Sequence, residues 1–372
     1  MAKRRYAVSY NRLIDVVSRY EPKDDIDWIL GRITNSKRVI IFGTGRSGDI
    51  ADAFAKFLRN IGIDQTFGPN DVPYVFGPCD LLIAISGSGS TQYTLEVARV
   101  AKEGGSFIIS LTSDSNSPLA LISNKIILIP GARKWKDSDY FINNLLGTPT
   151  APLTPLGTLF ELRALLFLLS LVSYIRGEEL TESYRKLIAI IKEFEPPSEY
   201  YEKLYEILPK ASAYAKQKTT VLGEGLSGIV GRFFSTRLRH LSKGNTERLV
   251  NFWLDKGSVA VRHDDLVLII SGSASEFFAT LAEKARTKGA KVATVTSFQD
   301  SKLAKVSDLT LVIPGRQIFK LKGLRSSYFP QDPKYSAFEL RTLFFLESFI
   351  HYVAEKENIS ETDIKMMHSD FT

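Results

Sequence analysis

The strongest constraint on the fold of this chain is an internal repeat with a period of about 180 residues. A glycine-rich turn follows a short apolar run at residues 43–48 and again at 223–228. Three further pairs follow in the same order: Ile85-Ser86-Gly87-Ser88 with Ile270-Ser271-Gly272-Ser273, Ile129-Pro130-Gly131 with Ile313-Pro314-Gly315, and Phe160-Glu161-Leu162-Arg163 with Phe338-Glu339-Leu340-Arg341. Four ordered matches at a nearly constant offset indicate a duplicated domain with small insertions.

Each half is predicted to be an α/β domain. Short, continuous apolar runs alternate with amphipathic segments, which indicates strands buried on both faces and hence a parallel sheet flanked by helices. The expected strands of the first half are residues 38–42, 81–85, 106–111 and 125–129. Long helical segments are expected before the halves at 10–34 and 199–216, and at their ends at 159–176 and 336–356.

The boundary between the halves is predicted at a pair of prolines. Pro196 and Pro197 block helix continuation and bias the preceding residue to an extended conformation. We therefore expect two domains, residues 1–195 and 196–372, each with its own core.

The composition excludes several classes of protein. Of 372 residues, 44% are hydrophobic and 24% are charged, which is ordinary for a globular chain rather than a disordered or fibrous one. The single cysteine, Cys79, can form no internal disulfide, so we expect a cytoplasmic protein. The first ten residues lead into a charged amphipathic stretch and nowhere do eighteen apolar residues run together, so we expect no signal peptide and no membrane partner. The net charge of +7 is scattered, which favours small anionic ligands at least as readily as nucleic acid, and we expect no nucleic-acid partner.

The first glycine turn, Gly43-x-Gly45-x-x-Gly48, has the spacing of a dinucleotide-binding loop between a strand and a helix. Its second copy carries Glu224 inside the turn, where a carboxylate would repel a pyrophosphate. Asp64 lies at the right number of residues after the glycine turn for the acidic residue that holds a ribose. It is expected at the beginning of its strand, however, and a ribose-binding acid stands at the end. A dinucleotide site and a purely structural turn both stay open as interpretations, and neither is favoured.

The second turn, Ser86-Gly87-Ser88-Gly89-Ser90-Thr91, is more informative, and we call it the serine turn. It follows a buried strand and opens a helix, where unpaired backbone N–H groups and the helix dipole attract an anion. The Gly-Lys-Ser/Thr ending of a nucleotide-binding P-loop is missing, so the turn suits a phosphate monoester. The alternative is that these residues are helix caps and turn residues only.

A carboxylate stands early in the next long helical segment. Glu161 follows Thr158 by three residues, so the two could form a capping box, or Glu161 could simply complement the helix dipole. The functional alternative is a general base at the rim of the ligand site.

At these three elements the chain resembles the sugar isomerase (SIS) domain superfamily, and its first half resembles the 6-phospho-3-hexuloisomerases within it. The resemblance implies two tandem flavodoxin-like domains, each with a five-stranded parallel sheet, that bind a hexose phosphate and isomerise it through an enediol without metal or cofactor. The segment 364–368 is similar to the histidine-bearing tail of those isomerases. Carried over, the phosphate- and sugar-binding residues are Gly45, Arg46, Ser47, Ser86, Ser88, Ser90 and Thr91, and the catalytic residues are Glu161 as base and His368 as acid.

The second half departs from the family pattern in three places: Leu226 stands for Arg46, Ala274 for Gly89 and Glu276 for Thr91. An acidic residue at the end of the serine turn would repel a phosphate, so we expect one phosphate site per chain, in the first half. An insert at 133–155 has no counterpart in the pattern and could be a lid or an interface arm.

The sequence therefore predicts an isomerase that moves a proton next to a carbonyl group, with 3-hexulose 6-phosphate and fructose 6-phosphate as the first candidate pair. A phosphoglucose/phosphomannose isomerase, a glucosamine-6-phosphate isomerase or deaminase-like enzyme, and a non-catalytic sugar-phosphate sensor are the alternatives. Single-domain members of the family form tetramers, which implies a homodimer for a fused pair.

Overall fold

The computed structural model describes residues 5–22, 26–73, 75–131, 158–255, 259–316, 332–360 and 363–364. These residues form two compact units. The first unit comprises residues 15–185 with the described residues after 359, and the second comprises 186–359 with the described residues before 15. Helices α1 (Arg5–Val17) and α8 (Leu180–Lys192) are each divided between the units. The predicted boundary near residue 195 stays a prediction.

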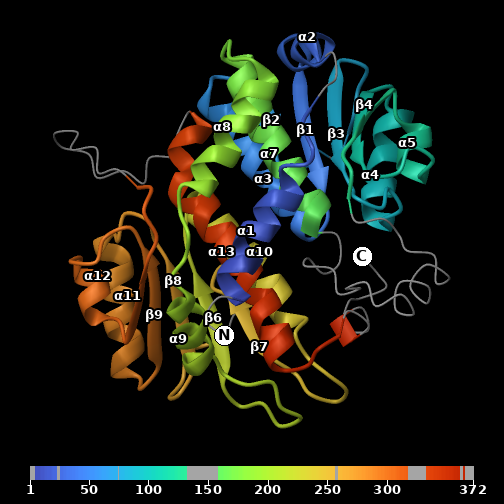
Figure 1. Cartoon of the computed structure of the whole chain (residues 1–372). Coiled ribbons are helices and arrows are strands. Elements are labelled where there is room, and N and C mark those ends of the chain that lie inside the picture. The colour runs from blue at the N-terminus through green and yellow to red at the C-terminus, as the bar shows by residue number, and fades with distance from the viewer. Residues whose placement is uncertain are drawn as a thin grey trace, which may run out of the picture. The chain divides into compact units, whose positions relative to one another are not determined.

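The first unit contains a five-stranded parallel sheet in the order β2-β1-β3-β4-β5, the flavodoxin-like arrangement (Figure 1). Helices α4 and α5 cover one face of the sheet, and α3 and α7 lie on the other. The elements are α2 (Asp27–Asn35), β1 (Arg38–Gly43), α3 (Arg46–Asn60), β2 (Thr66–Phe67), β3 (Asp80–Ile85), α4 (Gln92–Glu103), β4 (Phe107–Thr112), α5 (Pro118–Ile122), β5 (Lys125–Leu128) and α7 (Thr158–Ile175).

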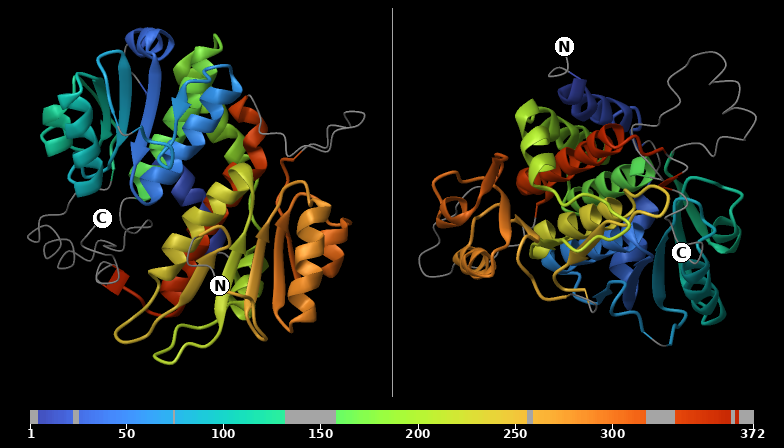
Figure 2. Two further views of the ribbon diagram at one scale, coloured as in Figure 1. Left: turned by 180° about the vertical axis from the view of Figure 1, so that it is seen from behind. Right: turned by 90° about the horizontal axis from the view of Figure 1, so that it is seen from below.

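The second unit repeats this topology in the order β7-β6-β8-β9-β10, again with all strands parallel. Helices α11 and α12 cover one face, and α10 packs against β6 and against α13, as the views in Figure 2 show. The elements are α9 (Ser198–Ile207), β6 (Lys218–Leu222), α10 (Gly225–Arg239), β7 (Leu249–Phe252), β8 (Leu266–Ile270), α11 (Glu276–Thr287), β9 (Lys291–Thr296), α12 (Lys302–Val306), β10 (Leu309–Val312), η2 (Pro333–Ser336) and α13 (Ala337–Lys356). The predicted fold class is confirmed.

Two predicted helical segments are shorter than expected. The segment 10–34 contains two helices, because α1 ends at Val17 and α2 begins only at Asp27, with Pro22 between them. Helix α9 ends at Ile207, just before Pro209, rather than continuing to residue 216. Proline lacks the N–H that an interior helical position needs, so the apolar periodicity on either side does not form one helix.

Helix α7 is the core helix of the first unit. Its 18 residues have a mean hydropathy of 1.7, which makes it the one helix in the described part of the chain long and apolar enough to cross a membrane. In the fold, 83% of that window is buried. A buried central helix between polar surface helices shows the same composition, so the apolar character of α7 is accounted for by packing.

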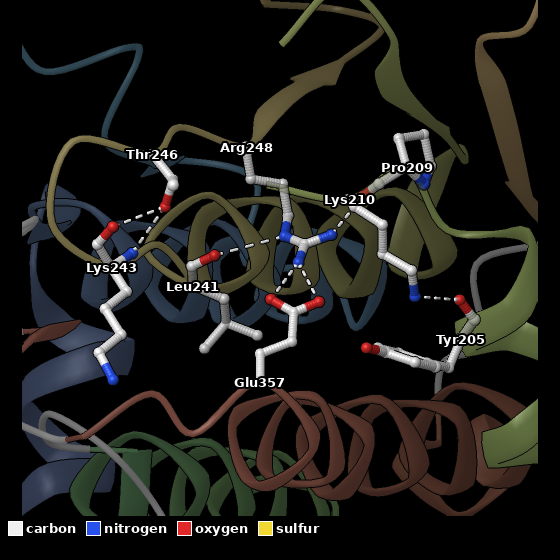
Figure 3. Close-up of polar contacts among 8 residues, drawn as sticks. All are labelled: Tyr205, Pro209, Lys210, Leu241, Lys243, Thr246, Arg248 and Glu357. Atoms are coloured by element: carbon white, nitrogen blue, oxygen red, sulfur yellow. Dashed lines mark hydrogen bonds and ion pairs between the residues drawn. The ribbon is translucent and has the colours of Figure 1, made fainter. Parts of the chain in front are cut away.

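A buried ion pair fastens the end of α13 in the second unit (Figure 3). The guanidinium of Arg248 donates to both carboxylate oxygens of Glu357 at 2.8 Å and to the backbone carbonyls of Pro209 and Leu241. The side chain of Arg248 is 1% exposed and that of Glu357 is 17% exposed. One arginine therefore joins the chain segments that follow α9, α10 and α13.

We expect Glu357→Gln to lower the free energy of unfolding by about 3 kcal/mol, because it leaves a buried guanidinium without its counter-charge. The matched control is Glu199→Gln, which breaks the solvent-exposed pair of Glu199 with Lys203 and should cost at most ~0.5 kcal/mol. Urea denaturation of the two variants checks this, and equal losses would contradict it.

Candidate functional site

The predicted site residues of the first unit lie at the point where the strand order reverses. Strand β1 sits between β2 and β3, so the chain leaves the carboxyl ends of β1 and β3 toward opposite sides of the sheet. This is where open α/β sheets bind their ligands. The glycine turn follows β1, and Gly45 adopts a φ of 57° just before α3, a conformation that favours glycine. The serine turn follows β3.

Hydrogen bonds within the serine turn hold its shape. The hydroxyl of Ser86 accepts from the N–H of Gly89 at 3.1 Å and bonds the hydroxyl of Thr91, also at 3.1 Å. The hydroxyl of Ser88 accepts from the N–H of Ser90 at 3.2 Å. Ser86 is buried, Ser88 and Thr91 are half-buried, and Ser90 is exposed. Ser86 is therefore mainly a turn residue, while the other three hydroxyls stand where a ligand can reach them.

The alternative interpretation as helix caps can be tested against other helices of the same fold. Ser117 caps α5 by accepting from the N–H of Ala120, and its repeat counterpart Ser301 caps α12 in the same way. Thr91, at the N-cap position of α4, makes no such bond. The first turn of α4 thus has no side-chain cap, which it shares with α2, α3, α9, α10, α11 and α13. Its backbone donors can therefore face an anion.

The serine turn and the start of α7 are in direct contact. A Cβ atom at Gly87 would lie 2.8 Å from the ring of Phe160, so only glycine allows this approach. Arg163 fixes the same end of α7 by donating to the carbonyls of Pro130 at 2.7 Å and Val16 at 2.6 Å. Glu161, between these two anchors, is consequently held at the sheet edge that carries the serine turn.

Glu161 forms an ion pair with Arg46, the first residue of α3. Nε of Arg46 lies 3.1 Å from Oε2 of Glu161, and Nη1 donates to the hydroxyl of Thr158 at 3.3 Å. The side chain of Arg46 is 3% exposed and that of Glu161 is 13% exposed. The sequence predicted both residues for the site, and the structure brings them together from opposite ends of the first repeat.

The second unit has a carboxylate at the corresponding place. Oε1 of Glu339 accepts from the hydroxyl of Ser227 at 3.2 Å and lies 3.5 Å from Nη1 of Arg316. Burial raises the pKa of Glu339, and the Arg316 charge and the Ser227 hydrogen bond only partly oppose this shift. A Cβ at Gly272 would lie 2.6 Å from the ring of Phe338, so the contact between turn and helix is repeated as well.

The serine turn of the second unit, Ser271-Gly272-Ser273-Ala274-Ser275-Glu276, keeps its shape despite its changed residues. Ala274 adopts a φ of 49°, close to the 59° of Gly89 in the first unit. This left-handed backbone conformation is strained for a residue with a side chain. Ser275, at the N-cap position of α11, makes no side-chain cap, as Thr91 does not. Glu276 is the first residue of α11 and its side chain is exposed.

One residue of the second site was missed by sequence reasoning. Arg316 directly follows the repeated Ile-Pro-Gly segment, at the position where the first repeat has Ala132. This difference between the repeats was the only feature of the sequence that could have indicated a role for Arg316. Two predictions, the catalytic role of His368 and the insert at 133–155, lie outside the described residues. Among the residues that the structure describes, no group of three His, Cys, Asp or Glu side chains could hold a metal ion.

Two flavodoxin-like units, each with a serine turn and an arginine–glutamate pair, define a duplicated α/β protein. The chain belongs to the SIS domain family: the SIS domain model matches residues 32–138 and 213–331, together more than half of the sequence. The match to both halves confirms the tandem arrangement that the repeat predicted.

Similar proteins share one part of the chain or its fold. An uncharacterized protein of Aeropyrum pernix is 40% identical over 142 residues, 37% of this chain and 66% of that protein. A 3-hexulose-6-phosphate isomerase of Methanocaldococcus jannaschii is 34% identical over 148 residues, 40% of this chain and 72% of that enzyme. The tagatose-6-phosphate ketose/aldose isomerase of Escherichia coli has the same fold over 97% of this chain and 96% of its own, with a TM-score of 0.59 at 15% identity.

The raised pKa of Glu339 predicts a pH-dependent stability. A buried carboxyl group with a raised pKa stabilises the fold while it is protonated, and this contribution is lost as the pH rises from the ordinary value of 4.5 through the folded-state pKa. We therefore expect Glu339→Gln to gain stability over the unaltered protein as the pH rises toward neutrality, by about 1.4 kcal/mol for each pH unit of the shift.

Urea denaturation at a series of pH values measures this difference. The matched control is Glu247→Gln, which removes an exposed carboxylate of the same unit and should give a difference that hardly varies with pH. Parallel stability curves for Glu339→Gln and the unaltered protein would show that Glu339 ionises normally in the fold.

Proposed function

We propose that this protein is a phosphosugar isomerase and that its first unit interconverts 3-hexulose 6-phosphate and fructose 6-phosphate. The observation that carries the proposal is the ion pair of Glu161 with Arg46 beside the uncapped serine turn. Membership of the SIS domain family and the likeness to a 3-hexulose-6-phosphate isomerase over 148 residues support the substrate class.

The serine turn is suited to the phosphate end of such a substrate. A phosphate monoester carries two negative charges near neutral pH and accepts several hydrogen bonds. Ser88, Ser90 and Thr91 offer hydroxyl groups, and the first turn of α4 offers backbone N–H groups. Hydrogen bonds to a charged group contribute roughly 1.5–3 kcal/mol each, so three or four of them suffice to anchor the substrate.

The carboxylate of Glu161 is suited to the proton transfer. Conversion of a 3-ketose to a 2-ketose removes the proton from C2, places the electron pair of that bond in a C2=C3 double bond, and protonates the C3 oxygen. The resulting enediol then loses its C2 hydroxyl proton and regains a proton at C3. One carboxylate can take the first carbon-bound proton and return it at the neighbouring carbon.

Arg46 is suited to stabilise the charge that develops on the substrate oxygens. Its guanidinium carries a fixed positive charge and several donors, and it is nearly buried against the carboxylate. A positive group held in place before the reaction favours an enediolate more strongly than a mobile one, because little reorganisation is needed.

We expect Glu161→Gln to reduce turnover roughly 10²–10⁴-fold with little change in the apparent KM, because the variant keeps the shape of the side chain but cannot accept the proton. Exchange of the C3 proton of fructose 6-phosphate in deuterated water, followed by NMR, measures this step. The control is Glu96→Gln on the exposed face of α4, which should exchange at the original rate. Full exchange in Glu161→Gln would rule out this residue as the base.

The serine turn of the first unit should carry the phosphate. The double variant Ser88→Ala with Thr91→Ala is expected to weaken binding of fructose 6-phosphate by roughly a hundredfold or more, since two donors to a charged group are lost. Titration calorimetry checks this, with Ser273→Ala in the second unit as the control that should bind as the unaltered protein does. Equal effects of the changes in both units would show that phosphate binds in both.

We also propose that the protein forms a homodimer, so that four SIS domains assemble as two fused pairs. Light scattering at micromolar concentration should return twice the chain mass of 41.6 kDa. An active protein with the mass of a single chain would exclude this assembly.

A further inference from the structure

Strand β5 is the last strand of the first sheet, so one of its two sides borders no further strand. We call this side the β5 edge. In a parallel sheet the backbone N–H and C=O groups of alternate residues point toward the neighbouring strand, and those of the residues between them point away from it. The N–H of Ile129 donates to the carbonyl of Thr112 in β4 at 2.9 Å. The backbone groups of Ile126 and Leu128 therefore point outward along the β5 edge.

The corresponding edge of the second sheet, at β10, is closed. The N–H of Ile313 donates to the carbonyl of Thr296 in the same way. Val312, the counterpart of Leu128 in the repeat, therefore points its backbone groups outward. The hydroxyl of Tyr200 in α9 binds both of these groups: it accepts from the N–H of Val312 at 3.2 Å and donates to its carbonyl at 3.3 Å. The second unit thus satisfies this edge from within the chain.

The described part of the first unit offers no such closing group. The helix before β1 is α2, and its Trp28 lies beside β5, where the ammonium of Lys125 is 5.5 Å from the centre of the indole ring. An indole N–H donates but does not accept, so it could not satisfy both groups as the tyrosine does. Among the residues that the structure describes, none forms a hydrogen bond with the outward backbone groups of Ile126 or Leu128.

Three apolar side chains are exposed at the β5 edge: Leu121 of α5 at 73%, Ile126 at 40% and Leu128 at 47%. Ile126 is the register partner of Ser110, which lies on the same face of the sheet as Ile108, a member of the core beneath α4 and α5. The two strand residues therefore lie on the face that carries α5. Figure 1 shows α5 at the outer margin of the first unit.

The second unit has different side chains at the matching positions, namely Lys305, Thr310 and Val312. Polar and charged residues on an edge strand are a common protection against pairing with another chain, and so is covering the edge. The second unit uses both devices and the first unit uses neither. Because the two units share one fold, an open apolar edge is a property of the first repeat and not a requirement of the architecture.

The β5 edge is complementary to a second copy of itself. When two β5 strands run antiparallel about a two-fold axis at Ile127, Ile126 of each chain lies opposite Leu128 of the other. Each of these pairs can exchange two backbone hydrogen bonds. Lys125 then lies opposite Ile129 of the other chain, so no like charges face each other across the strands. The exposed apolar side chains of both chains come together on the same face.

We propose that β5 pairs with β5 of a second copy of this chain, so that the sheets of the two first units join across a two-fold axis. This pairing is the interface of the homodimer proposed above, so it rests on that assembly and not on the isomerase activity. A two-fold pair closes both open edges with one contact. It also buries the apolar side chains that the second unit has replaced by polar ones.

The first test gives the first unit the residues of the second. Leu121→Lys with Ile126→Thr introduces the side chains that the second unit carries at the same positions, so the variant should fold. We expect light scattering at micromolar concentration to return the mass of one chain, 41.6 kDa, where the unaltered protein returns twice that mass. The matched control is Leu254→Lys, at a leucine of the second unit that is 61% exposed, which should leave the dimer intact.

A second variant changes the backbone. Leu128→Pro removes the outward N–H, which has no hydrogen-bond partner in the described part of the chain. Proline is tolerated at such positions of an edge strand, so the unit should keep its fold. This variant should also return the mass of one chain, and it keeps the test decisive should the double variant fail to fold.

Cross-linking tests the register. Chains with Cys79→Ser and either Ile126→Cys or Leu128→Cys are co-expressed and then oxidised with glutathione disulfide. Opposite residues in a hydrogen-bonded antiparallel pair have Cα atoms about 5.5 Å apart, which suits a disulfide. We expect covalent dimers from the mixture and none from either chain alone, because equivalent residues of the two strands lie roughly 7–8 Å apart or more.

These measurements separate the interface from the assembly. A dimer that persists in both Leu121→Lys with Ile126→Thr and Leu128→Pro would overturn the pairing while the homodimer stands, and would mean that another partner covers β5. Covalent dimers from either cysteine chain alone, or none from the mixture, would also overturn it. An unaltered protein with the mass of a single chain would remove both the homodimer and its interface.

Discussion

The contact between a glycine of the serine turn and a phenylalanine of the central helix positions everything else at the site. Gly87 meets Phe160 in the first unit and Gly272 meets Phe338 in the second. Because the glutamate is the next residue in the helix, this contact brings the turn and the carboxylate to the same edge of the sheet. An arginine two residues further on locks the helix by binding the proline carbonyl of the preceding segment, Pro130 in one unit and Pro314 in the other.

The two units share this backbone arrangement but differ in the electrostatic environment of the glutamate. In the first unit the glutamate and arginine are joined directly at 3.1 Å. In the second, the arginine is farther away, at 3.5 Å, the glutamate is more deeply buried, and its pKa is raised. Duplication explains how this is possible, since one copy can keep the original activity while the other changes its partners around an unchanged backbone. A carboxylate whose protonation is set by burial is also the kind of group that marks functional sites.

The helices α1 and α8 show how strongly the fold repeats beyond the matching motifs. Arg163 of the first unit donates to the carbonyl of Val16 near the end of α1, and Arg341 of the second donates to the carbonyl of Ile190 near the end of α8. The two helices share little obvious sequence, yet each supplies backbone acceptors to the same arginine of its unit. The requirement is for a carbonyl rather than for a side chain, so the sequence is free to vary there.

The sequence by itself determined the duplication, the parallel sheets and the positions of the serine turn and Glu161, because these depend on local signals: apolar runs, glycines and helix starts close together in the chain. It overestimated helix length at residues 10–34 and 199–216, where a proline outweighs apolar periodicity. Only the tertiary structure decided that Thr91 leaves α4 uncapped and that Arg316 takes the place of the missing arginine. Such contacts join residues far apart in the sequence; Ser227 and Glu339, for example, are separated by 112 positions. They exist only once the strands have fixed their register.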